Sequence, residues 1–282
     1  MSLPLNHEQN TSAPPKAKLR ILSSDWARMN PNLIAKFYPV KRLRDGKGWE
    51  QSRDVRTLSQ VDEFVVDDGY EVHCPITDGN MDITLGWASP FEAVGTDSRA
   101  PTLSASLQAG AITPNLQAID ARWASSIGSS GIANALAEAD GRSGMTKLNS
   151  TQVFAGMPPV KFTLTAHFRA LADPRSEVRD PITQLEEWAV PQFLADEGLI
   201  AGSINSAGRS SFMQSVFPSA VPKVIAMQYA DMRISPLVIE SMSKPFTVPR
   251  TAEGFALTTA VQLTLCTLTA WDRRDVARVF AR

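Results

Sequence analysis

The side chains that most often carry out catalysis are few and scattered in this chain. Its histidines are His7, His73 and His167, and its two cysteines are Cys74 and Cys266. His73 and Cys74 are adjacent in a strand-like stretch, so they would point to opposite faces and could not act as base and nucleophile together. The sequence contains no zinc-protease, P-loop, dinucleotide or EF-hand motif. We therefore expect no catalytic residues, no cofactor and no metal site.

Carboxylate pairs and serine motifs point the same way. Asp67-Asp68 precedes Gly69 and indicates a solvent-facing turn, while Glu186-Glu187 falls on the polar side of a predicted helix. The run Gly128-Ser129-Ser130-Gly131 lacks the spacing of a hydrolase nucleophile elbow, and no strand leads into it. These residues predict turns and helix surface rather than an active site.

Composition limits the kinds of partner. The 282 residues are 43% hydrophobic, and 28 Lys and Arg balance 29 Asp and Glu to give a net charge of −1. A basic cluster at 41–47, beside Trp49, could hold a phosphate backbone, but the balanced charge favours a solvated loop. The chain has neither a signal-peptide core nor about eighteen consecutive apolar residues. We expect cytoplasmic synthesis, no membrane contact and no disulfide framework.

The elements that must position any site are organised around residues 160–190, where a strand is expected to lead into a helix. Alternate residues of 160–170 are apolar, which is typical of a half-buried strand. Asp173-Pro174-Arg175-Ser176 breaks this pattern. The apolar face of the predicted strand consists of Val160, Phe162, Leu164, Ala166, Phe168 and Ala170.

A helix is predicted to begin directly after this break. Asp180 is expected to cap its N-terminus, Pro181 suits its first position, and Pro191 ends it. Its apolar stripe is expected to cover a sheet, and it consists of Ile182, Leu185, Trp188 and Ala189.

Most other segments predict strands. A hairpin is expected from 61–66 and 70–74, and a third strand over 81–87 would complete a meander. Further strands are expected over 223–234, 236–240 and 255–266, and the first of these should lie centrally in the sheet because both its faces are apolar. Short helices are predicted around 32–38 and after Asp272.

The predicted domain organisation is simple. Residues 1–18 are polar and rich in proline, which indicates a flexible N-terminal arm. Residues 19–282 are expected to form a single β-rich domain. This domain would carry a loop-rich insertion at about 88–150, where Ala, Ser, Gly, Thr and Pro predominate.

Two stretches together carry a resemblance to a known class of proteins. The segment FAGMPPVKFTL at 154–164, continued through His167-Phe168-Arg169-Ala170 to the predicted helix, resembles a pattern in baseplate and tail-tube-associated proteins of contractile-tailed bacteriophages. The SMSKPF stretch at 241–246, followed by Gly254 and the alternating residues 261–265, resembles the closing strands of tube-initiator or tube-capping subunits. The resemblance covers roughly residues 80–275.

The resemblance implies a structural virion protein with an α+β, mainly β fold. Antiparallel sheets would form a tail-tube-like β-sandwich or barrel, with a helix packed on the sheet and loop-rich insertions. The protein would form a six-fold ring of its own copies where the baseplate meets the tail tube. Its partners would be tail-tube, baseplate and sheath proteins, with DNA only as passing cargo. It would be made in the bacterial host cytoplasm and reside in the phage tail.

Ten residues are predicted to matter most for the core and for assembly. The apolar ones are expected to hold the subunit together, and Arg273 and Arg274 to contact neighbours. A tail-associated enzyme or carbohydrate-acting module, using His167 and a nearby carboxylate, is the alternative, and the net charge disfavours a nucleic-acid-binding module. The ten residues are Phe162, Leu164, Phe168, Ile182, Leu185, Trp188, Val261, Leu263, Arg273 and Arg274.

Overall fold

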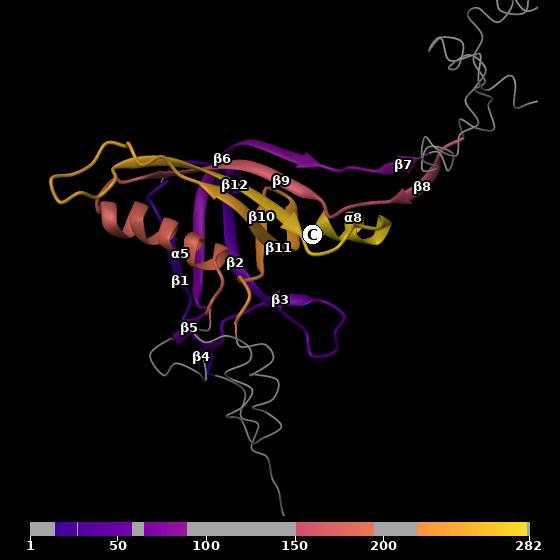
Figure 1. Ribbon diagram of the computed structural model, residues 1–282. Helices are drawn as coiled ribbons and strands as arrows, with labels where there is room; N and C mark the ends of the chain where they lie inside the picture. The colour runs from indigo at the N-terminus through magenta and orange to yellow at the C-terminus, as the bar shows by residue number, and fades with distance from the viewer. Residues whose placement is uncertain (1–14, 27, 58–64, 89–150, 195–218, 281–282) are drawn as a thin grey trace, which may run out of the picture. The chain divides into compact units, whose positions relative to one another are not determined.

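The computed structural model describes residues 15–26, 28–57, 65–88, 151–194 and 219–280. The chain divides into two compact units: Met1–Thr84 with Pro158–Arg282, and Leu85–Met157. The first unit contains the main sheet and both described α-helices (Figure 1). Most of the loop-rich insertion predicted at about 88–150 lies outside the described residues.

Six strands of the first unit pair in a closed cycle. In order around the cycle, β6 pairs with β9, β9 with β12, β12 with β11, β11 with β10, and β10 with β2, which pairs back to β6. Every one of these pairings is antiparallel. The strands are β2 (Ile34–Arg42), β6 (Tyr70–Asp82), β9 (Lys161–Arg169), β10 (Ile225–Tyr229), β11 (Met232–Ser243) and β12 (Thr258–Thr267). The fold is therefore mainly β, as the sequence predicts.

One face of all six strands points into the cycle. Directly paired residues share a face of a sheet, and Phe37 of β2 pairs with both Val72 of β6 and Met227 of β10. Ala166 of β9 likewise pairs with both Ile76 and Val261. Register shifts in β6, β10 and β11 adjust the strands so that the cycle closes. The buried apolar residues of this face include Ala35, Phe37, Val72, Cys74, Phe162, Leu164, Ala166, Phe168, Ile225, Met227, Ile234, Leu237, Ile239, Val261, Leu263 and Leu265.

Short strands extend this cycle at its margins. β1 (Arg20–Ser23) pairs in parallel with the start of β6, and β3 (Trp49–Gln51) pairs with the end of β2. On the outer face of β2, a second apolar cluster forms from Tyr38, Val40 and Ala226, with Trp49 packed against it. The margins of the cycle are thus held by apolar contacts as well as by backbone pairing.

The last residues of the predicted N-terminal arm are bound to the fold. The Ala17 N–H donates to the Arg53 carbonyl at 2.7 Å, and the Val55 N–H donates to the Pro15 carbonyl at 3.0 Å. A Cβ added at Gly69 would lie 2.6 Å from the Ala17 Cβ, so this approach requires glycine. Pro15 and Ala17 of the predicted arm are thus hydrogen-bonded to the fold, and residues 1–14 lie outside the described part.

The strand and helix predicted over 160–190 are both present, but the helix begins earlier than expected. Buried residues alternate along β9 as predicted. The Asp173 carboxylate accepts hydrogen bonds from the N–H groups of Arg175 (3.1 Å) and Ser176 (3.2 Å), and a π-helical turn, η2 (Arg175–Arg179), follows. Asp180 is the first residue of α5 (Asp180–Ala189) and has helical backbone angles. The predicted cap at Asp180 is wrong because Asp173 already caps the continuous helical segment.

Helix α5 packs against strands of the cycle with its predicted stripe. Ile182, Leu185 and Trp188 are buried, and the helix contacts β11, β6 and β1 (Figure 1). The Lys223 N–H donates to the Trp188 carbonyl at 3.0 Å and fixes the C-terminal end of the helix. The second helix, α8 (Arg273–Val279), begins with a capping box between Asp272 and Asp275, which agrees with the predicted cap.

Three predicted elements are wrong. The helix expected around 32–38 is a 3₁₀ turn, η1 (Pro31–Leu33), followed by β2, whose residues are buried on both faces. β5 (Val65–Asp67) pairs with β4 (Val55–Thr57) instead of forming a hairpin with β6, which continues to Asp82. The single strand expected over 223–234 is a hairpin of β10 and β11, since Tyr229 pairs with Met232.

The described residues of the second unit form a two-stranded ribbon. β7 (Gly86–Ala88) pairs with β8 (Val153–Gly156), and the rings of Trp87 and Phe154 meet edge to face with centroids 5.4 Å apart. Among the described helices of the whole chain, none is long and apolar enough to cross a membrane.

An acidic residue on the inward face should unfold the first unit. Val261→Asp or Phe162→Asp would bury a carboxylate without a partner, and we expect a loss of about 4 kcal/mol or more in the free energy of unfolding. Urea denaturation followed by circular dichroism would measure it. The matched controls are Gln262→Asp and Thr163→Asp, which change the exposed neighbours of the same two strands. If the controls were as destabilised as the inward variants, the assignment of faces would be wrong.

Candidate functional site

The ten residues singled out in the sequence fall into two groups in the structure. Phe162, Leu164, Phe168, Val261 and Leu263 lie on the inward face of the cycle. Ile182, Leu185 and Trp188 lie on the buried side of α5. Arg273 and Arg274 are exposed in the first turn of α8, where neither is bonded through its side chain to another described residue.

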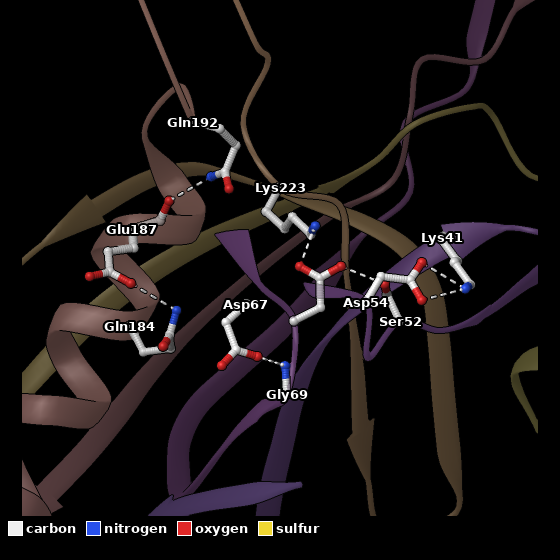
Figure 2. Close-up of polar contacts among 10 residues, drawn as sticks. Lys41, Ser52, Asp54, Asp67, Gly69, Gln184, Glu187, Gln192 and Lys223 are labelled. Atoms are coloured by element: carbon white, nitrogen blue, oxygen red, sulfur yellow. Dashed lines mark hydrogen bonds and ion pairs between the residues drawn. The ribbon is translucent and has the colours of Figure 1, made fainter. Parts of the chain in front are cut away.

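Three of the buried polar side chains in the described part of the chain form a cluster that the sequence did not reveal. The Lys223 ammonium pairs with Asp68, whose other carboxylate oxygen accepts a hydrogen bond from the Ser52 hydroxyl (Figure 2). The side chains of Lys223 and Asp68 are 9% and 5% exposed. The cluster therefore joins three segments that are far apart in the sequence: the chain after β3, the turn before β6 and the chain before β10.

A turn before β6 directs Asp68 into the protein. The Gly69 N–H donates to the Asp67 carboxylate at 2.8 Å, and the Asp68 N–H donates to the Asp54 carbonyl at 3.1 Å. Asp67 also pairs with Arg20 near the surface. The sequence predicted that both carboxylates of Asp67-Asp68 face solvent, which is wrong for Asp68. No local pattern marks Asp68 or Lys223 as buried, because aspartate and lysine side chains usually face solvent.

Lys41 lies beside this cluster and has its own carboxylate. Its ammonium donates to both carboxylate oxygens of Asp54, at 2.9 and 2.7 Å (Figure 2). The hydrogen bond to Asp54 raises the pKa of Lys41 above its ordinary value. Of the basic cluster at 41–47, Lys41 is thus engaged within the protein, Arg42 is the last residue of β2, and Arg44 and Lys47 lie in the loop that joins β2 to β3.

The environment of Lys223 disfavours its charge. Burial lowers the pKa of Lys223 below its ordinary value, and the charge of Arg56 lowers it further, while Asp68 acts in the opposite direction. These groups line a recess of about 200 Å³ on the surface of the first unit, which we call the polar recess. The charged residues that line the polar recess are Lys41, Asp54, Arg56, Asp68 and Lys223.

The end of α5 borders the polar recess. The Gln192 side chain donates to the Glu187 carbonyl at 2.9 Å, and the Gln184 side chain donates to the Glu187 carboxylate at 3.0 Å (Figure 2). Gln192 also lines the polar recess. The helix terminus and the buried ion pair are therefore parts of one arrangement.

The histidines and cysteines are separated as their strand positions predict. His73 lies on the outer face of β6, with its Nε2 atom 3.0 Å from a carboxylate oxygen of Glu71, while Cys74 is buried on the inner face. Burial raises the pKa of the Cys74 thiol, which makes it a poor nucleophile. His167 lies on β9 with its Nε2 atom 2.8 Å from the Thr77 hydroxyl. No group of three or more potential metal ligands occurs in the described part of the chain.

A larger open groove of about 520 Å³ lies between α5 and the segment that joins β11 to β12. The Arg250 guanidinium holds this segment by donating to the carbonyls of Gly254 and Phe246, at 2.8 and 3.1 Å. Apolar side chains line the groove together with the basic residues Arg179, Lys244 and Arg250. Phe246 is one of the lining residues, and it is 81% exposed.

Large apolar side chains are exposed near the junction between the two units in the sequence. Met81 and Ile83 of the first unit are exposed, as are Trp87 and Phe154 of the second unit, at 54% and 49%. Aromatic side chains of this size are enriched in the contacts of protein interfaces. The ribbon of the second unit therefore has the composition of a contact surface.

No protein-family model matches this chain, and no curated protein sequence matches it.

Removal of one partner of the buried ion pair should destabilise the fold strongly. Lys223→Met would leave the Asp68 carboxylate buried without its cation, and we expect a loss of about 3–5 kcal/mol in the free energy of unfolding. The double variant Lys223→Met with Asp68→Leu should recover most of that loss, because neither charge remains. Urea denaturation of the two single variants, the double variant and the unchanged chain gives the coupling. Additive losses would show that the pair does not act as a unit.

Acidification should weaken the fold through His73. Burial lowers the pKa of His73 below 6.5, and Glu71 opposes this effect. Between the folded pKa and 6.5 the unfolded chain binds more protons, so this contribution to stability is complete above about 6.5 and is lost as the pH falls through the folded pKa. Denaturation midpoints measured across this range should fall less steeply in His73→Gln. Glu71→Gln should steepen the fall, because the carboxylate raises the pKa of His73; equal slopes in all three proteins would contradict the assignment.

Proposed function

We propose that this protein is a structural subunit of a contractile phage tail, at the junction between the baseplate and the tail tube. It would assemble through protein–protein contacts into a ring, with copies of itself as neighbours and with tail-tube, baseplate and sheath proteins above and below. In this role the fixed shape of the subunit, rather than a chemical reaction, would template or lock the first ring of the tube. DNA would be cargo that passes through the ring.

The observation that carries this proposal is the closed antiparallel cycle of strands with α5 packed along it. This architecture is what the sequence resemblance to tube-initiator and tube-capping subunits implies. A closed cycle leaves few unpaired strand edges, so a subunit built this way can present fixed surfaces to neighbours without uncontrolled strand pairing. Head-to-tail contacts between such surfaces close into rings when the rotation between copies divides the circle evenly.

The exposed apolar side chains also support assembly. Trp87 and Phe154 are about half exposed on their ribbon, and Phe246 is almost fully exposed at the groove. Burial of such side chains between subunits would stabilise a contact by about 25 cal/mol for each Å² of apolar surface removed from water.

The alternative, a tail-associated enzyme or carbohydrate-acting module, has weaker support. Most glycoside hydrolases need two carboxyl groups that flank the scissile bond. Among the described residues that line the open groove, Glu253 is the sole acidic residue, and backbone and side-chain hydrogen bonds lower its pKa. A carboxylate with a lowered pKa is a poor proton donor near neutral pH.

Electron microscopy of the purified protein would test the proposal, both alone and mixed with an extract that contains phage tail components. Native mass spectrometry of the same samples would give the stoichiometry. The proposal expects closed rings, or rings that cap short tubes in the mixture. A compact monomer that binds no tail component would overturn the proposal. Assays for hydrolysis of cell-wall polymers would then be the next test.

Reversal of two charges should separate assembly from folding. Arg273→Glu with Arg274→Glu changes exposed residues in the first turn of α8, where acidic side chains suit the helix dipole, so the thermal unfolding midpoint should stay unchanged. Ring formation should weaken, because the proposed contact loses two positive charges. Arg44→Glu with Lys47→Glu, which reverses two exposed charges in the loop between β2 and β3, is the control for a general charge effect. Normal rings with both arginines reversed would remove these residues from the contact.

A further inference from the structure

Basic residues outnumber acidic ones in the lining of the polar recess. Its lining contains three basic residues and two acidic ones. Lys41 is engaged with both oxygens of Asp54, and Lys223 is paired with Asp68. The side chain of Arg56 makes no hydrogen bond or ion pair with any other residue that the structure describes, although its backbone lies in the β4–β5 pairing. Within the described part of the chain, Arg56 is therefore the cation of the polar recess that has no carboxylate partner.

The hydrogen bonds of the cluster leave donors available beside Arg56. The Asp68 carboxylate is occupied on one oxygen by Lys223 and on the other by Ser52. An ammonium group has three N–H donors, and within the described part of the chain the Lys223 ammonium has Asp68 as its acceptor. A guanidinium group has five donors in a planar fork. The polar recess thus combines unused donors from two cations that are close enough for the charge of one to affect the other.

We propose that the polar recess binds a small oxyanion group, a phosphate or a carboxylate, held by Arg56 and Lys223. Arg56 would bind two of its oxygens through the guanidinium fork, and the buried ammonium of Lys223 would donate to the same group. The volume of about 200 Å³ suits a group of this size rather than a nucleotide or a sugar chain. The inference stands apart from the proposed assembly role, because it depends on the geometry of one subunit.

The energetics of Lys223 favour this occupant. A charged lysine that is 9% exposed is destabilised by loss of water, and the neighbouring Arg56 adds repulsion. An anion between the two cations would relieve both effects at once. Binding should therefore be accompanied by a rise in the pKa of Lys223.

Calorimetric titration of the full chain would test the site, with inorganic phosphate in one arm and acetate in the other, at constant ionic strength in a chloride buffer. We expect saturable binding of one anion per chain, with affinity reduced about tenfold in Arg56→Gln. Arg53→Gln is the matched control, because Arg53 is also exposed, lies three residues away and does not line the polar recess. Circular dichroism would verify that both variants are folded.

The two arms distinguish the source of the oxyanion. Tighter binding of phosphate would assign a phosphate group, and tighter binding of acetate would assign a carboxylate, such as an acidic side chain of a partner. As a second readout, NMR titration of the Lys223 side chain should show a higher pKa when the anion is bound. Absence of saturable binding in both arms, or an equal loss of affinity in Arg53→Gln and Arg56→Gln, would overturn the proposal.

Discussion

The closed pairing of six strands is the constraint on which the rest of the structure depends. In an open sheet each strand can shift its register at the cost of its own contacts alone. In a closed cycle each strand has two neighbours. A shift of one residue in any strand would turn its inward side chains outward and would disturb its pairing with both neighbours at once. Ala166 is held in this way between Ile76 and Val261. The apolar interior and the backbone ladder therefore specify each other, and the outer faces are left available for other contacts.

The sequence predicted the elements whose pattern is local and regular. Strict alternation located β9 and β12, and the spacing of Ile182, Leu185 and Trp188 located α5. Prediction was wrong where the determining contact is distant in sequence. β2 is a strand because β10 and β6 flank it on both sides, although its own residues show no alternation. The turn between β10 and β11 was missed because Ala230 occupies a left-handed conformation, at φ 52°, where glycine or asparagine is usual.

The candidate sites were harder to predict than the fold. An ion pair such as Lys223 with Asp68 joins residues more than a hundred positions apart, and no local pattern marks either partner as buried. Their burial depends on three chain segments that the folded structure brings together. Such a pair adds little net stability compared with apolar side chains of the same size, but it penalises any arrangement that leaves one charge alone. It is a means of fixing where these segments meet.

The way in which the second unit joins the first has a consequence for the evolution of this chain. Residues 85–157 leave from the end of β6 and return at the start of β9, and these two strands are directly paired there, with Met81 opposite Phe162 and Asp82 opposite Lys161. The two points of attachment are thus held at the spacing of neighbouring strands, whatever lies between them. Because the entropy of closing a loop grows only slowly with its length, segments of very different size can be exchanged at this position. The cycle can serve as a constant frame, while the inserted segment diverges to suit a different neighbour.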